Sequence, residues 1–533
     1  MPQPNVAAIE RTAKTAFGWS QLRDGQLEAM QAALAGRDTL VVMPTGAGKS
    51  ACYQVPALLI DGPTVVVSPL IALQRDQVVD LLDHGAFAAN SAQRASVLDE
   101  GWDALAAGDV EFIFLSPEQL AKADVRDRLA DVSPSLLVVD EAHCVAAWGH
   151  DFRPDYLRLS DVIEQLGHPV VMAMTATASP PVRAEIVHRL GLRDPVEVVR
   201  GFDRPNLFLE VVQPRSDEVK RDAVVLRAAG EVKPGIVYTA TRKDAESYAA
   251  ALAELGLRAA SYHAGMRAAA REQVHQRFLD DDLDVVVATT AFGMGIDKPN
   301  VRFVIHADVP ESLDSYYQEI GRAGRDGGDA ATVLFYRPED LGLRKFFTSA
   351  SADPVVLQRV AKLVELHDGP IEPPTLREAA KLSATRLTTA VNLLEDAGAL
   401  TVDEAGRITP PDDAPAPADA AEEAMQRAKE REAVDRSRVE LVRAYAETVG
   451  CRRQFLVGYF GETYDPPCNA CDRCATGDVG DSDSDGFTWR PNDRVRHDSW
   501  GDGVVMRCES DRVTVLFETV GYKTIRLDAV VAA

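Results

Sequence analysis

The sequence predicts an α/β fold: two parallel-sheet domains, followed by a winged-helix-like α domain, a helical metal-binding module and a small β-barrel. Two series of short apolar runs, each separated from the next by a helical stretch, predict the two sheets. The runs are 39–43, 64–68, 112–116, 136–140 and 170–175, and then 235–239, 259–263, 284–289, 301–307 and 330–335. Short runs that are apolar throughout are typical of parallel strands covered by helices on both faces.

After residue 346 the pattern changes. Helical patterns at 357–367, 376–382 and 384–397 precede two short strand-like segments that can pair across 404–406. Helix, turn, helix and hairpin in this order indicate a winged helix, although a plain helical linker would also fit. The last segment shows short alternating strands with glycine turns, a pattern that favours a small β-barrel.

Changes in composition mark the expected domain boundaries. Residues 411–420 are rich in proline and alanine, and residues 477–486 are acidic and contain glycine, so both are typical of linkers. The predicted order is 1–204 for the first sheet domain, 205–346 for the second, 347–410 for the winged-helix-like domain, 411–420 for a linker, 421–476 for the metal module, 477–486 for a linker and 487–533 for the barrel.

The formal net charge of −25 argues against a nucleic-acid partner, because phosphate binding depends on positive charge. The acidic residues are, however, concentrated in stretches such as 281–284, 412–423 and 478–485, which need not touch a nucleic acid. Net charge governs solubility and encounter rate and does not decide the site. The chain has no apolar run of about 18 residues and no signal-peptide pattern, so we expect a soluble cytoplasmic protein with no membrane partner.

Residues 43–50, MPTGAGKS, stand between a predicted strand and a predicted helix. Glycines there let backbone N–H groups curl around phosphates, Lys49 can neutralise phosphate oxygens, and Ser50 can ligate Mg²⁺. Met43 stands where the strict phosphate-loop pattern has glycine or alanine, and a chance glycine-rich turn is the alternative. The sequence predicts a nucleotide site.

Asp140 and Glu141 end another predicted strand. A carboxylate at that position can hold Mg²⁺, and its neighbour can orient or deprotonate the attacking water, so we assign Asp140 to the metal and Glu141 to the base. Phosphoryl transfer also needs positive charge on the γ-phosphate, which Arg322 and Arg325 can supply. Such residues in isolation usually belong to the solvated surface, but their order along the chain favours chemistry.

Four cysteines lie close together in the sequence. Cys451, Cys468, Cys471 and Cys474 are separated by sixteen, two and two residues. Clustered thiols without a signal peptide favour metal binding in a reducing compartment. Four thiolates favour a closed, structural Zn²⁺ site, while an iron–sulfur cluster uses the same ligands and stays an alternative.

These motifs, in this order, resemble those of superfamily-two helicases and more closely those of the RecQ family. The resemblance covers residues 16–336 and 449–474. Its specific segments are FGWSQLRDGQ, MPTGAGKSACYQVP, VVSPLIALQRDQV, FLSPEQL, DEAHCVAAWGHDFRPDY, MTATA, YHAGM, ATTAFGMGIDKPNVRFVIHADVP, YYQEIGRAGRDG and CRRQFLVGYFGE. The resemblance implies that both sheets are RecA-like, that ATP and Mg²⁺ bind between them, and that zinc binds the four cysteines.

The resemblance also implies three sets of site residues. The adenine and phosphate set is Phe17, Arg23, Gln26, Thr45, Gly46, Gly48, Lys49 and Ser50. The set contributed from the second domain is Asp297, Gln318, Arg322 and Arg325, with Arg325 as the arginine finger. The DNA-binding and coupling set is Ser68, His143, Trp148, Phe152, Arg153, Thr175 and Thr177, in which the two aromatic side chains would stack on unpaired bases.

The function implied is that of an ATP-dependent DNA helicase, travelling 3′ to 5′ on single-stranded DNA and unwinding duplex in repair or recombination. A translocase that does not unwind, and a scaffold that recruits partners, are the alternatives; an RNA substrate is a weaker one. The winged-helix-like insert precedes Cys451, unlike in typical RecQ proteins, so their strand-separating hairpin cannot be carried over. The tail resembles the SH3/Tudor-like barrel of UvrD-type helicases, which implies RNA polymerase or a repair protein as a partner; its basic residues could instead form a DNA-facing patch, namely Arg494, Arg496, Arg507, Arg512, Lys523 and Arg526. We expect a monomeric chain.

Overall fold

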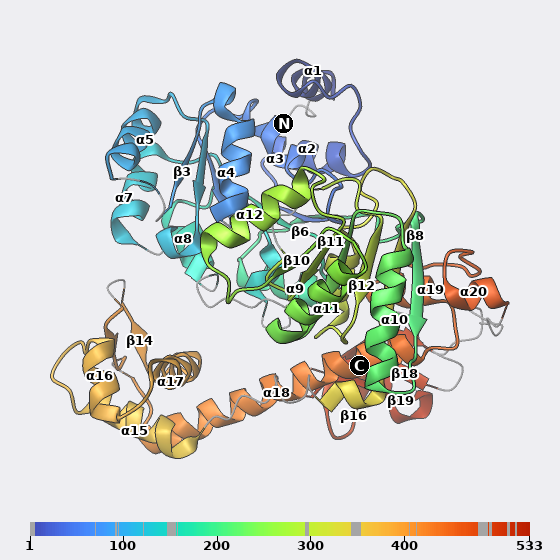
Figure 1. Cartoon of the computed structure of the whole chain (residues 1–533). Helices are drawn as coiled ribbons and strands as arrows, with labels where there is room; N and C mark the ends of the chain where they lie inside the picture. Colours follow the sequence, from blue (N-terminus) through green and yellow to red (C-terminus); the bar gives the residue numbers. More distant parts are fainter. Residues whose placement is uncertain are drawn as a thin grey trace.

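The structure is a computed structural model of the 533-residue chain. It describes residues 6–69, 71–90, 93, 95–120, 122–146, 156, 158–293, 298–342, 353–403, 406–411, 413–477, 489, 493–508, 512–517 and 520–533. Two parallel sheets with helices on both faces form its larger part (Figure 1). The two-sheet α/β prediction is confirmed.

The first domain has a seven-stranded parallel sheet in the order β3-β4-β2-β5-β6-β1-β7. The strands are β1 (Thr39–Val42), β2 (Thr64–Val67), β3 (Ala86–Ala89), β4 (Phe112–Leu115), β5 (Leu136–Val139), β6 (Val170–Thr175) and β7 (Val196–Val199). The helices are α1 (Val6–Phe17), α2 (Gln26–Leu34), α3 (Ala51–Ala57), α4 (Ile71–Asp80), α5 (Ala95–Ala107), α6 (Pro117–Leu120), α7 (Ala123–Val132), α8 (Leu159–Gln165) and α9 (Pro180–Arg189). Alternate strand residues enter two apolar cores, one on each face of the sheet.

The second domain has a six-stranded parallel sheet in the order β10-β11-β9-β12-β13-β8. Its strands are β8 (Leu207–Val212), β9 (Gly235–Tyr238), β10 (Ala259–Tyr262), β11 (Val285–Ala288), β12 (Phe303–His306) and β13 (Ala330–Phe335). Its helices are α10 (Asp217–Gly230), α11 (Arg242–Glu254), α12 (Ala268–Leu279) and α13 (Leu313–Ile320). Three edge strands, β3, β7 and β8, are absent from the predicted runs, because each is partly exposed and lacks the continuous apolar pattern of a central strand.

The described residues between the second sheet and residue 411 include three helices and a small hairpin. They are α15 (Pro354–Glu365), α16 (Pro373–Ala380), α17 (Ala384–Asp396), β14 (Thr401–Val402) and β15 (Ile408–Thr409). An isolated antiparallel bridge joins Ile371 to Ile408, so a short extended segment before α16 pairs with the hairpin. This order of helices and strands is that of a winged helix.

The long helix α18 (Pro417–Glu447) connects this unit to the metal module and begins inside the stretch 411–420 that composition predicts as a linker. Its first turns are ordered by burial, because Ala420, Ala421 and Ala424 pack into the core of the winged-helix-like unit. Figure 1 shows α18 running from that unit to the underside of the second domain. The metal module follows with α19 (Arg452–Tyr459) and α20 (Asp472–Thr476).

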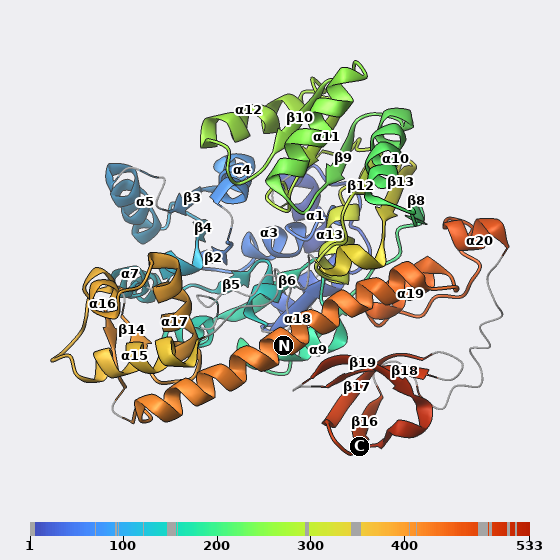
Figure 2. The same ribbon diagram turned by 60° about the horizontal axis from the view of Figure 1, so that its bottom comes forward.

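Residues 493–533, called here the C-terminal β-domain, form a five-stranded antiparallel sheet in the order β19-β18-β17-β16-β20. The strands are β16 (Arg494–His497), β17 (Gly501–Cys508), β18 (Arg512–Phe517), β19 (Gly521–Arg526) and β20 (Val531–Ala532). Figure 2 shows this sheet against α18 and close to α9 and α19. Among the helices of the described residues, none combines the length and the hydropathy needed to span a membrane.

Candidate functional site: a nucleotide cleft and a four-cysteine metal site

The phosphate loop connects β1 to α3. Gly46 and Gly48 adopt left-handed backbone angles, with φ of 82° and 79°, which glycine tolerates best. A Cβ on Gly48 would lie 2.8 Å from Gln26 Nε2, so space as well as conformation favours glycine there. The Lys49 ammonium donates hydrogen bonds to the carbonyl oxygens of Met43 (3.0 Å) and Pro44 (3.4 Å), which holds the lysine within the loop.

An acidic pair faces this lysine from the end of β5. Burial lowers the pKa of Lys49, while the charges of Glu141 and Asp140 oppose that shift. Burial, reinforced by the charge of Glu141, raises the pKa of Asp140 to about 6. The Asp140 carboxylate accepts hydrogen bonds from Ser68 Oγ (3.3 Å) and from the Glu141 backbone N–H (3.0 Å). Ser50 and Asp140 therefore offer the hard oxygen ligands that Mg²⁺ prefers.

A buried polar chain runs from the acidic pair to the segment after β6. His143 Nδ1 lies 3.3 Å from Glu141 Oε2 and 2.9 Å from Thr175 Oγ1. Thr175 Oγ1 in turn donates to the carbonyl of Thr177 at 3.2 Å. Burial disfavours a charged His143 ring, but its Cys144 and Glu141 neighbours outweigh that effect and raise the pKa of His143 well above its ordinary value. A change at the acidic pair thus has a direct path to Thr175 and Thr177.

Of the three residues predicted for adenine, Arg23 and Gln26 contact the phosphate loop, while Phe17 lies against Trp19. The Gln26 amide donates to the Gly48 carbonyl (2.9 Å) and accepts from the Arg23 backbone N–H (2.7 Å). The Arg23 guanidinium donates to the Gly46 carbonyl. Phe17 stacks on Trp19 with ring centroids 4.6 Å apart. The loop before α2 and the phosphate loop are therefore joined by hydrogen bonds from Arg23 and Gln26.

The second domain reaches the phosphate loop through Arg325. A Cβ placed on Gly46 would lie 3.4 Å from Arg325 Cγ, and the charge of Arg325 contributes to the lowered pKa of Lys49. Arg322 is buried inside the second domain beside Tyr238 and Gly293. Gln318 lies on α13, one turn before Arg322. The two arginines that the sequence groups together thus occupy different environments, with Arg325 at the cleft.

Two polar residues that the sequence interpretation did not single out hold Ser68 in place. The Gln74 amide donates to the Ser68 carbonyl at 2.8 Å, and Asn90 donates to the Gln74 side chain at 3.1 Å. Gln74 belongs to the segment VVSPLIALQRDQV, so its position in that motif is the signal that could have found it. Asp297, Trp148, Phe152 and Arg153 lie outside the described residues.

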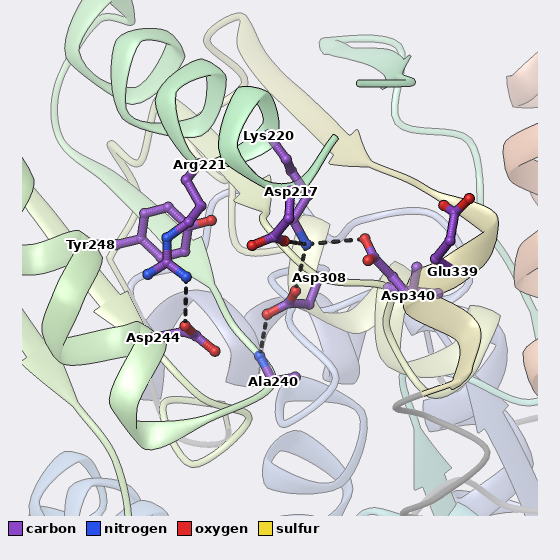
Figure 3. A pocket seen from close by; sticks show the side chains of 10 residues that line it. Asp217, Lys220, Arg221, Ala240, Asp244, Tyr248, Asp308, Glu339 and Asp340 are labelled. Carbon is purple, nitrogen blue, oxygen red and sulfur yellow. Dashed lines mark hydrogen bonds and ion pairs between the residues drawn. The ribbon is translucent and has the colours of Figure 1, made fainter. Parts of the chain in front are cut away.

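A separate pocket of about 210 Å³ lies in the second domain around Lys220 (Figure 3). The Lys220 ammonium lies 3.0 Å from both Asp308 and Asp340. Arg221 pairs with Asp244 at 3.2 Å and covers the ring of Tyr248. Since these charges satisfy one another and Asp308 also accepts the Ala240 N–H, the cluster fixes the ends of β9 and β12.

The four cysteines converge as predicted. Cys451 and Cys471 immediately precede α19 and α20, Cys474 lies in α20, and Cys468 lies in the loop between the two helices. Their sulfur atoms all lie within 4.8 Å of one another. Each sulfur also receives a backbone N–H: the donors to Cys451, Cys468, Cys471 and Cys474 are the N–H groups of Gln454 (3.5 Å), Ala470 (3.4 Å), Cys474 (3.4 Å) and Cys468 (3.3 Å). Hydrogen bonds of this kind orient and stabilise thiolate ligands, so the donor set fits a structural Zn²⁺ ion.

The metal module is attached to the second sheet. Leu209 of β8 forms a parallel bridge with Cys471, and its N–H donates to the Ala470 carbonyl at 3.0 Å. Arg452 makes a bidentate ion pair with Asp472 at 2.6 and 2.9 Å, which ties α19 to α20. The metal site therefore fixes a connection between the second domain and α19.

Comparison with known proteins agrees with this geometry. Family profiles match residues 23–185 (DEAD/DEAH box helicase), 221–327 (helicase conserved C-terminal domain) and 417–475 (RecQ zinc-binding). The ATP-dependent DNA helicase RecQ of Pasteurella multocida (strain Pm70) is 36% identical over 460 residues, which cover 86% of this chain and 61% of that protein. The probable ATP-dependent DNA helicase RecS of Bacillus subtilis (strain 168) is 33% identical over 482 residues, covering 88% and 92%.

Among solved structures, the DUF1998 helicase MrfA bound to DNA superposes with a TM-score of 0.54 at 18% identity, covering 79% of this chain and 61% of that one, which shows the shared fold. Fold and cleft define a two-domain, RecA-like nucleotide-binding protein. The chain belongs to the RecQ family of superfamily-two DNA helicases. It spans 57% to 62% of the length of the RecQ proteins of P. multocida, B. subtilis and Haemophilus influenzae.

Loss of one thiol tests the metal site. Cys471→Ser should lower zinc affinity by more than about 100-fold, because even residues that only support a ligand are worth 10- to 100-fold. Zinc content by elemental analysis and competition with a chelator measure this. Cys508→Ser, which removes a thiol of the C-terminal β-domain, is the matched control. Equal zinc content in both variants and the wild type would contradict the assignment, and bound iron would favour the iron–sulfur alternative.

The raised pKa of Asp140 predicts a pH dependence for Mg²⁺. A carboxyl group with a pKa of about 6 is protonated below that pH and then cannot ligate the metal. Between pH 7 and pH 5 the Mg²⁺ concentration needed for half-maximal binding of a non-hydrolysable ATP analogue should rise about tenfold. Calorimetric titration measures it, and Asp140→Asn controls for protonation of the nucleotide. The same pH dependence in both proteins would assign the effect to the nucleotide.

Proposed function

We propose that this chain is an ATP-dependent DNA helicase that moves 3′ to 5′ along single-stranded DNA and separates duplex DNA, in repair or recombination. The observation that carries the proposal is the approach of Arg325 to Gly46 across the cleft. A phosphate loop from one sheet and an arginine from the other would grip the same triphosphate, so hydrolysis would require domain closure. The names of the RecQ relatives support DNA as the substrate.

The chain's own residues account for the steps of hydrolysis. Glu141 orients the attacking water and accepts its proton, while Lys49 and Arg325 stabilise the charge that develops on the phosphoryl group. Mg²⁺ held by Ser50 and Asp140 would neutralise the phosphate oxygens. His143 and Thr175 form the path by which the state of the acidic pair reaches the segment after β6. Repeated closing and opening of the cleft would move the bound strand.

A surface for duplex DNA is proposed on α17. Its residues from Ser383 to Leu393 include no carboxylate, in a chain of net charge −25. Its exposed side chains include Arg386, Thr388 and Asn392, which suit phosphates and base edges in a major groove. Arg386 lies 3.6 Å from Asp353 in an exposed ion pair, and a DNA phosphate would compete with that carboxylate. The two acids at the helix end, Glu395 and Asp396, are engaged by Arg158 (3.0 Å) and Arg431 (3.3 Å).

Further expectations concern partners and place. We propose a monomeric chain acting in the cytoplasm close to the nucleoid. RNA polymerase or a repair protein could bind only those faces of the C-terminal β-domain that α18 and α19 do not cover. A translocase that strips proteins without unwinding remains the second candidate, because it would use the same cleft. Strand displacement on 3′-tailed and 5′-tailed duplexes distinguishes it from a helicase.

Lys49→Ala should abolish DNA-stimulated ATP hydrolysis and strand displacement, a loss of at least about 100-fold, because it removes the ammonium that the phosphate loop holds for the phosphate oxygens. Thermal unfolding of the variant should match the wild type. Displacement of only the 3′-tailed substrate by the wild type is the expected polarity. Stimulated hydrolysis without displacement of any duplex would support the translocase, and retained turnover in Lys49→Ala would refute the site.

Charge reversal tests the duplex surface. Arg386→Glu should weaken binding to blunt duplex DNA about tenfold and reduce its salt dependence, while hydrolysis stimulated by single-stranded DNA stays unchanged. Lys362→Glu, the same kind of reversal on α15, is the matched control. Fluorescence anisotropy at several salt concentrations gives both quantities. Equal effects of the two substitutions would show that only overall charge matters, and the α17 surface would be rejected.

A further inference from the structure

The C-terminal β-domain is packed into the motor. Its buried side chains Met506, Leu516 and Tyr522 belong to the same continuous apolar core as residues of both sheets and the metal module. Strand β19 packs on α18, and β17 packs on α19. Figure 2 shows the sheet lying along α18. A module that only recruited partners would need no more than a flexible linker to the motor. The C-terminal β-domain instead shares a buried core with the two motor domains.

The contact with α18 depends on a glycine. Gly521 begins β19 with a φ of 70°, and a Cβ at this position would lie 2.2 Å from Ser437 Oγ and 3.1 Å from Val434 Cα. Ser437 is itself buried and donates to the Val434 carbonyl at 2.6 Å, so its hydroxyl has little room to move. The turn before β19 is therefore pressed directly against the backbone of α18.

Next to this contact, Tyr522 enters a buried polar network. The hydroxyl groups of Tyr522 and Tyr459 lie 3.2 Å apart, and Tyr459 donates to the Asp314 carboxylate at 2.5 Å. All three side chains are at least nine-tenths buried. Ser179, two residues after Thr177, also lies close to the Tyr522 hydroxyl. We call Ser179, Asp314, Tyr459 and Tyr522 the seam.

The seam joins both halves of the motor. Asp314 lies in the first turn of α13, the helix that leads to Arg322 and Arg325. The charges that face Asp314 are those of Arg438 on α18 and His143 of the acidic segment. Ser179 immediately precedes α9 in the first domain. One tyrosine of the C-terminal β-domain thus meets the first domain, the metal module and, through Tyr459, the helix that precedes Arg322 and Arg325.

We propose that Tyr522 is a positioning residue that stabilises the closed arrangement of the two motor domains, so that the C-terminal β-domain tunes the affinity for ATP. The proposal rests on the proposed ATPase function. The seam exists in the same arrangement in which Arg325 lies against Gly46. Tyr522 lies between Ser179 of the first domain and the Tyr459–Asp314 pair that reaches the second, and contacts that hold these groups together favour the closed cleft and, with it, nucleotide binding.

Tyr522→Phe removes one hydroxyl and keeps the ring. A buried hydrogen bond of this kind is worth about a two- to tenfold change in an equilibrium constant. We expect the KM for ATP, and the dissociation constant of a non-hydrolysable analogue, to rise by about that factor, with kcat at saturating ATP within about twofold of wild type. Tyr459→Phe should act alike, and the double variant should add little, because both hydroxyls serve one network.

Thr524→Val is the matched control. It removes a hydroxyl from the same strand, β19, and that hydroxyl lies 2.9 Å from the Thr514 hydroxyl inside the C-terminal β-domain. It should leave KM unchanged. A second variant, Ser437→Arg, places bulk between α18 and Gly521 and should raise KM at least as much as Tyr522→Phe. If Tyr522→Phe lowers the melting temperature or kcat without changing KM or analogue affinity, the residue is merely structural and the proposal is overturned.

The outcomes separate this proposal from the one it rests on. A wild type that binds the analogue but neither hydrolyses ATP nor displaces a strand would refute the helicase function, while the dissociation constants would still decide the role of Tyr522. Normal hydrolysis in the wild type together with unchanged KM and analogue affinity in Tyr522→Phe and Ser437→Arg would refute the role of Tyr522 and leave the helicase function intact.

Discussion

The approach of Arg325 to the phosphate loop constrains the rest of the motor. Two separate sheets must hold this arginine and Lys49 within reach of one ligand, although the two residues are far apart in the sequence. Like charges repel, so an arginine beside a lysine is stable only with compensating carboxylates close by. Asp140 and Glu141 supply them from the end of β5. The acidic pair therefore offsets the positive charges of Lys49 and Arg325, in addition to its proposed roles in binding Mg²⁺ and activating water.

Buried polar groups surround this contact and make the arrangement specific. Asp314, His143 and Thr175 lie in surroundings where an unpaired polar group would cost roughly 1–3 kcal/mol. Each has a partner at hydrogen-bonding distance: His143 and Thr175 bond within the first domain, and Asp314 bonds Tyr459 of the metal module. Other bonds connect the first domain to its neighbours, from Tyr317 to the Phe202 carbonyl (3.0 Å) and from Arg183 to the Phe460 carbonyl (2.9 Å), and a relative shift of the domains would break these together. Closure is therefore expected to behave as a switch between discrete states, since partial arrangements leave groups unpaired.

Features that depend on local chemistry could be predicted from the sequence. The phosphate loop, the acidic pair and the four cysteines are each defined by neighbouring residues, and the central strands by continuous apolar runs. The edge strands β3, β7 and β8 escaped prediction because one side of each is only partly covered. The network of Tyr522, Tyr459 and Asp314 could not be predicted, since its members come from three modules and a lone tyrosine or aspartate carries no pattern.

The helix α18 has a mechanical consequence. At 1.5 Å per residue its 31 residues form a rod of about 46 Å. One end is packed into the core of the winged-helix-like unit and the other into the core shared by the metal module and the motor. Arg158 of the first domain also donates hydrogen bonds to Glu395 and to the Val402 carbonyl of that unit, each at 3.0 Å. The winged-helix-like unit is therefore held at two points, and α18 would act as a strut that makes the unit move together with the first domain.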